Sequence, residues 1–88
     1  MADLTVTITL NEIQQAIMNN DLLDIKTWIE EAVAGKESNC WKRMQTEWTT
    51  RLMNDESFTD PIPSNQEDFV ALVTSRDDYK TRAERDAE

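Results

Sequence analysis

The chain has few of the residues that build catalytic and metal sites. Its 88 residues include no histidine and one cysteine, Cys40. An internal disulfide is therefore impossible, and a zinc or other transition-metal site would lack its usual ligands. Neither Cys40 nor any serine has a histidine to serve as its base, so the sequence predicts no activated nucleophile and no enzyme. We interpret Cys40 as a small core residue.

Glycine is also nearly absent, since Gly35 is the only one. A glycine-rich phosphate loop is therefore excluded, and no calcium-loop pattern with its central glycine occurs. Adjacent acidic pairs such as Glu30 and Glu31 point about 100° apart on a helix, so they do not converge on a ligand. Solvated surface is the preferred interpretation, and we predict no cofactor and no metal. An alternative is a weak ion site in the loop that contains Asp55, Glu56 and Asp60.

The sequence has few basic residues and no long apolar run. Nine basic residues face 18 acidic ones, which gives a net charge of −9. Such a surface repels a phosphate backbone, so direct nucleic-acid binding is not expected. No apolar run approaches the ~20 residues of a membrane span, and the N-terminus does not read as a signal peptide. We expect a soluble, intracellular chain with no membrane contact and no small-molecule substrate.

One stretch has strand character, "LTVTITL" at residues 4–10. Its apolar residues alternate with threonine, the period of a half-buried β-strand. No second segment has comparable strand character, and a single strand is not stable in water. The sequence therefore predicts that this strand pairs with another chain. The predicted partner-binding residues are Leu4, Val6, Ile8 and Leu10.

Two helices are expected after this stretch. Asn11 and Gln14 have the spacing of a capping box, which predicts a short helix over about 12–18. Asp21 is a candidate N-cap for a second helix that runs from Leu22 to about Met53, because apolar residues recur there at helical spacing. The alternative is a helical hairpin that breaks at Gly35, with Ser38 or Asn39 capping the next helix.

The C-terminal third begins with a proline-containing loop at 55–64, in which Pro61 and Pro63 forbid a regular helix. Ser64 and Glu67 predict a capping box and a helix that starts at Asn65, continues at least to Tyr79 and frays towards residue 88. The predicted fold is mainly α, a small helical bundle with an intermolecular strand. It forms one small domain over 1–88, with a strand arm (1–10), a helical part (11–54), a loop (55–64) and a C-terminal helix (65–88).

Trp41, Met44 and Trp48 lie on one face of the long predicted helix, because the tryptophans are two turns apart. One interpretation is core packing against the C-terminal helix. The other is that they protrude as anchors for another protein, since tryptophan and methionine are enriched in interface cores. We include all three among the predicted partner-binding residues.

The order of motifs carries a resemblance. A threonine-rich start, then "WIEEAV", then "IPSNQEDFV" resembles a loose group of short orphan proteins of tailed bacteriophages and prophages, often encoded in structural gene modules. The resemblance implies a minor virion component (capsid, neck or tail) or an assembly factor. Such a protein would bind other phage structural proteins or copies of itself, as a homo-oligomer, in the virion and in the host cytoplasm during assembly. The group carries no site residues over to this chain.

A different function is also compatible with the composition. Acidic helices can imitate the phosphates of nucleic acid, so the chain could be a phage-encoded inhibitor of a host defence protein or nucleic-acid-binding protein. Basic residues, among them Lys42, Arg43 and Arg51, interrupt the acidic surface. We therefore rank the inhibitor second.

Overall fold

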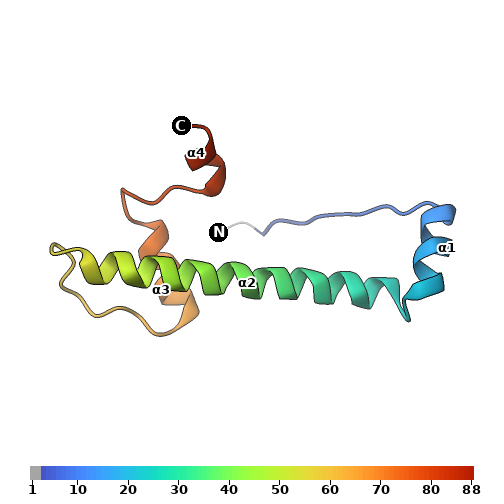
Figure 1. Ribbon diagram of the computed structural model, residues 1–88, viewed down its shortest axis with the longest axis horizontal. Helices are drawn as coiled ribbons and strands as arrows, with labels where there is room; N and C mark the ends of the chain where they lie inside the picture. Colours follow the sequence, from blue (N-terminus) through green and yellow to red (C-terminus); the bar gives the residue numbers. More distant parts are fainter. Residues whose placement is uncertain (1–2) are drawn as a thin grey trace. The chain divides into compact units, whose positions relative to one another are not determined.

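The computed structural model describes residues 3–88, and within that range the chain is helical and irregular (Figure 1). The helices described are α1 (Glu12–Asp21), α2 (Ile25–Asn54), α3 (Gln66–Thr74) and α4 (Arg82–Asp86). The chain divides into two compact units, Met1–Ser38 and Asn39–Glu88, which we call unit 1 and unit 2. The division falls within α2, so this helix contributes to both units.

The predicted N-terminal strand is wrong. Residues 4–10 have no regular secondary structure, and no strand is present anywhere in 3–88; the first two residues of the predicted arm lie outside the described part. A strand needs a second strand to take up its N–H and C=O groups. The described chain offers only helices and loops, so alternation of apolar residues alone does not produce a strand here.

The capping box that starts α1 is confirmed. The Gln14 backbone N–H donates to the Asn11 side chain at 2.8 Å, and the Asn11 backbone N–H donates to the Gln14 side chain at 2.9 Å. However, α1 continues to Asp21, so Asp21 does not cap the next helix. Asp24 does so, because its carboxylate accepts from the Thr27 backbone N–H at 2.9 Å. For this reason α2 starts at Ile25 rather than at the predicted Leu22.

The prediction of one long helix is confirmed. α2 runs without a break through Gly35 to Asn54, so the hairpin alternative is wrong. An added Cβ at Gly35 would meet nothing within 4 Å, so no close contact there requires a glycine. Cys40 is exposed on this helix, which corrects its interpretation as a core residue.

Unit 2 has a small apolar core between α2 and α3. Its buried side chains are Trp48, Leu52, Phe69 and Val73, and partly buried residues pack against the cluster, namely Trp41, Met44, Ile62 and Tyr79. The rings of Trp41 and Phe69 meet edge to face at 5.4 Å between centroids, a favourable aromatic geometry. The contact by Ile62 fixes the proline-containing loop to this core.

The single C-terminal helix predicted over 65–88 is wrong. α3 is capped by Asn65 instead of Ser64 and ends at Thr74, and α4 starts only at Arg82. Ser75 caps the end of α3, where its hydroxyl donates to the Leu72 carbonyl at 2.7 Å. The turn that follows leads to Tyr79, whose ring lies 6.0 Å from that of Trp48.

Candidate functional site

Unit 1 exposes most of the large apolar side chains of the described chain. No residue in 3–38 is buried. The exposed large apolar residues of this unit are Leu4, Val6, Ile8, Ile13, Ile17, Leu23, Trp28 and Val33, whereas unit 2 exposes Met53 alone among the residues described. Apolar surface concentrated in this way is typical of an interaction site.

An open groove of about 630 Å³ lies within unit 1. The segment before α1, α1 itself and the first turns of α2 all contribute to it. Its apolar lining is Val6, Ile8, Leu10, Ile25 and Ile29, and its polar lining is Thr7, Gln15, Lys26 and Glu30. A groove with mainly aliphatic walls and a few polar groups has the composition of a binding site rather than of a reactive centre.

Two local hydrogen bonds shape the segments that line the groove. The Gln15 side-chain amide donates to the Leu10 carbonyl at 2.9 Å, which ties α1 to the segment before it. The chain then turns after α1 and re-enters a helix at the Asp24 cap. In α2, Ile25 and Ile29 are four residues apart and therefore share one face of the helix.

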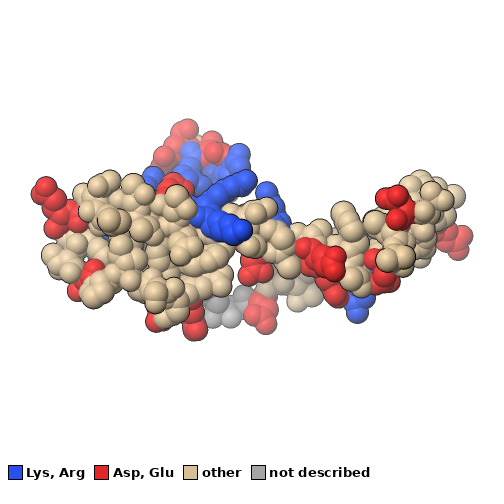
Figure 2. Space-filling view, turned by 60° about the horizontal axis from the view of Figure 1, so that its bottom comes forward, with Lys and Arg blue, Asp and Glu red and all other residues tan. Residues whose placement is uncertain are grey.

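The groove belongs to an acidic unit. Residues 1–38 carry a net charge of −5, and Figure 2 shows red patches with little blue over the part that carries α1. At the groove, Lys26 and Glu30 form an exposed ion pair at 3.9 Å. Hydrogen bonds from the Thr27 hydroxyl and backbone N–H hold the pKa of Asp24 below its usual value. Asp24 therefore adds to the negative charge of this unit at neutral pH.

The predicted partner-binding residues lie in two different environments. Val6, Ile8 and Leu10 line the groove. Leu4 is not part of the lining and is 89% exposed. Trp48 is only 6% exposed in the core of unit 2, with Trp41 and Met44 packed against it. Those three positions match the core interpretation, and a role for them in partner binding stays a prediction.

Ile25 and Ile29 were not among the predicted partner-binding residues. The signal was present, since Ile25 and Ile29 are four residues apart and share the apolar face of the predicted long helix. The structure adds Ile25 and Ile29 to the residues from 4–10.

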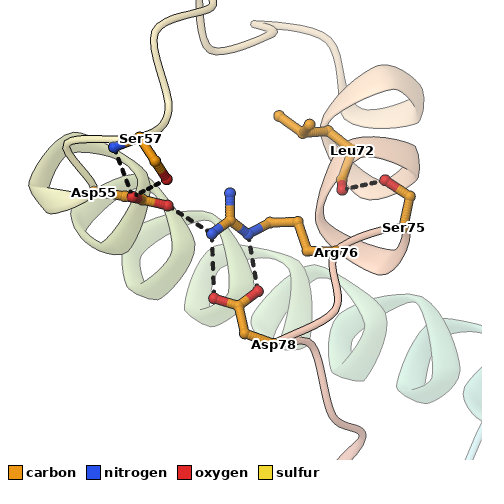
Figure 3. A network of polar contacts seen from close by, with 6 residues as sticks. All are labelled: Asp55, Ser57, Leu72, Ser75, Arg76 and Asp78. Atoms are coloured by element: carbon orange, nitrogen blue, oxygen red, sulfur yellow. Dashed lines mark hydrogen bonds and ion pairs between the residues drawn. The ribbon is translucent and has the colours of Figure 1, made fainter.

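Unit 2 contains a polar network around Arg76 (Figure 3). The Arg76 guanidinium donates to Asp55 at 2.8 Å and to Asp78 at 2.9 and 3.2 Å. Asp55 also accepts from the Ser57 hydroxyl at 2.6 Å and from the Ser57 backbone N–H at 3.0 Å. This network links the end of α2 to the turn after α3, and no local sequence signal indicates it.

The network has a structural rather than a catalytic character. The Ser57 hydroxyl, and then Arg76, lower the pKa of Asp55 to about 2. Arg76 likewise lowers the pKa of Asp78. A carboxylate with so low a pKa is a poor proton acceptor at neutral pH, so it is not suited to general base catalysis. Asp55 is also held by these partners, which weakens the alternative of a loop ion site with Glu56 and Asp60.

Other kinds of site find no support in residues 3–88. No group of three or more histidine, cysteine or acidic side chains in that range is placed to hold a metal ion. None of the helices described combines the length and the apolar character needed to cross a membrane. Comparisons with protein-family models, curated proteins and solved structures found no match to the chain.

Proposed function

We propose that this chain is a non-catalytic protein that acts by binding other proteins through unit 1. The observation that carries the proposal is the distribution of exposed apolar residues. Eight of the nine large apolar side chains that the described residues expose lie in unit 1, and three of its aliphatic residues from 4–10 line a groove with Ile25 and Ile29.

The exposed apolar side chains of unit 1 are in contact with water in the free chain. Full burial of one valine, leucine or isoleucine side chain contributes roughly 1.5–3 kcal/mol. Unit 1 gains little of this within the free chain, because none of its described residues is buried. A partner that covered several of these side chains would therefore supply a substantial binding free energy, reduced by the cost of association.

The biological setting we propose follows from the resemblance to short proteins of phage structural modules. The chain would be a minor component of a tailed phage particle or a factor in its assembly. Its partner would be another structural protein of that particle.

Quantitative mass spectrometry of purified phage particles tests this function. We expect the wild-type chain at a fixed ratio to the major structural proteins. We expect Ile29→Lys, which places a charge in the groove, to be strongly depleted from particles. Met53→Lys is the matched control, since it adds the same charge at an exposed apolar residue of unit 2, and it should be incorporated normally.

Two results would count against the proposal. One is that the chain is absent from purified particles. The other is that Ile29→Lys and Met53→Lys are incorporated equally well, because the groove would then have no role in the contact.

A further inference from the structure

We infer that the groove of unit 1 binds a basic amphipathic helix of a different protein. This inference rests on the proposed function and adds the chemistry of the partner. Three features of the described residues support it: the lining of the groove, the charge around it, and the surfaces that a second copy of the chain would present.

The lining favours a helix as the occupant. Residues 4–10 are not a strand, so they offer no sheet edge to which an extended peptide could add. A helix satisfies its own backbone hydrogen bonds and needs only an apolar face for docking. The aliphatic walls formed by Val6, Ile8, Leu10, Ile25 and Ile29 provide a complementary surface.

The charge favours basic flanks on that helix. Residues 1–38 sum to −5, and Glu12 of α1 and Glu31 of α2 are both exposed. At the groove itself Lys26 and Glu30 pair, so their charges offset, and the excess negative charge of the unit comes from its other acidic residues. Lysine or arginine residues beside the apolar face of a partner would therefore meet complementary charge, which raises the association rate and selects the partner.

A second copy of the chain does not provide such a surface. Unit 1 against unit 1 would oppose two surfaces of −5 each. Residues 39–88 also sum to −4, and among them only Met53 is a large exposed apolar residue. Trp48 lies in the core of unit 2 and Trp41 packs against it. We therefore expect the full chain to be a monomer at physiological salt.

Isothermal titration calorimetry with two designed peptides tests the inference on the full chain. Both peptides have about 18 residues, long enough to form a helix, and carry the same leucine face. One has lysine and the other glutamate on the flanks of that face. We expect the lysine peptide to bind at least ~10-fold more tightly at about 50 mM salt, and this ratio to shrink at about 300 mM because salt screens exposed charges.

Substitutions locate the binding. Ile29→Lys should weaken binding of the lysine peptide at least ~10-fold, because it places a cation in an apolar groove. Met53→Lys changes the net charge equally and should leave the affinity within ~2-fold. Static light scattering of the same samples reports whether a second copy occupies the groove instead.

Three results would overturn the inference: equal affinity for both peptides, equal loss in the two variants, or a dimer of the free chain that Ile29→Lys dissociates. The failures of the two proposals are distinguishable. A chain that is present in particles but does not prefer the lysine peptide keeps the proposed function and loses the basic helix. A chain that prefers the lysine peptide but is absent from particles keeps the basic helix as its ligand and loses the proposed role in the particle.

Discussion

Asp55 and Arg76 are 21 residues apart in the chain, and their contact is the main polar link between the end of α2 and the turn after α3. Both side chains are largely covered, with 27% and 22% of their surface exposed. The Arg76 guanidinium also lies 5.9 Å from the Trp48 ring. This single arginine therefore joins two carboxylates and the edge of the apolar core.

The first prediction concerns the pH dependence of stability. The pKa of Asp55 in the folded chain is about 2, below the usual 3.8, so folding favours its ionised form. The stabilisation is complete above about pH 5, declines as the pH falls through 3.8, and is largely lost near pH 2. We expect Asp55→Asn to lower the melting temperature at pH 7, with a difference from wild type that narrows at pH 2 to 3. Thermal unfolding followed by circular dichroism measures this.

Glu56→Gln is the control for this prediction, since Glu56 is the exposed neighbour and the side-chain hydrogen bonds of Arg76 go to Asp55 and Asp78. It should change the melting temperature little at either pH. A constant difference between Asp55→Asn and wild type from pH 7 to pH 2 would contradict the role of the carboxylate charge.

The second prediction concerns the core of unit 2. Leu52 is 2% exposed, whereas its neighbour Met53 is 74% exposed. Leu52→Ala should lower the free energy of unfolding by about 2–5 kcal/mol, because it removes buried methyl groups and leaves a cavity. Met53→Ala should change it by less than about 0.5 kcal/mol. Urea unfolding followed by tryptophan fluorescence distinguishes the two, and a similar effect of both would place the core elsewhere.

At the scale of elements, α2 is the longest helix, and its interior contains Gly35, a residue of low helix propensity. Its backbone has no positive φ, and an added Cβ has free space around it. Gly35→Ala should therefore stabilise the helix by up to about 1 kcal/mol. Circular dichroism at 222 nm during thermal unfolding measures the gain.

Ala34→Gly is the matched reverse change in the same exposed turn of α2. It should lower the stability of the helix by about the same amount. Lower helicity in Gly35→Ala than in wild type would contradict the prediction that alanine stabilises α2 at this position.

Local signals predicted some helix boundaries and missed others. The capping box of Asn11 and Gln14 depends on residues three apart, so the sequence contains all of it. Thr81 and Glu84 form an equivalent box at the start of α4, in a segment that was predicted to continue the previous helix. The end of α3 depends on contacts of Arg76 and Tyr79 with α2 and its end, and tertiary contacts of this kind are not visible in a local pattern.

The strand was predicted wrongly for a related reason. The alternation in residues 4–10 indicates which side chains would lie on the same face of an extended segment. The hydrogen bonds that make such a segment a strand come from a partner segment. The candidate site was partly predicted, because Val6, Ile8 and Leu10 do line the groove. Its other wall, Ile25 and Ile29, required knowledge of where α1 ends and α2 begins.

At the scale of the whole molecule, the two units differ in how they are stabilised. Unit 2 has buried aromatic and aliphatic residues, the Arg76 network, and an ion pair between Arg85 of α4 and Glu47 of α2 at 3.8 Å. Unit 1 has capping hydrogen bonds and no buried residue in its described part. Helices without tertiary packing are marginal in water at lengths below ~12–15 residues. Unit 1 is therefore the part that gains most from a partner.

Amide hydrogen exchange of the free chain, resolved by residue with nuclear magnetic resonance, tests this claim most directly. Amides near the core, such as those of Leu52 and Val73, should exchange slowest, because their exchange requires unfolding of unit 2. Amides in α1 and in the first turns of α2 should exchange at least ~100-fold faster, since little apolar burial opposes their opening. Equal protection in α1 and α3 would contradict the account, because unit 1 would then be stable without a partner.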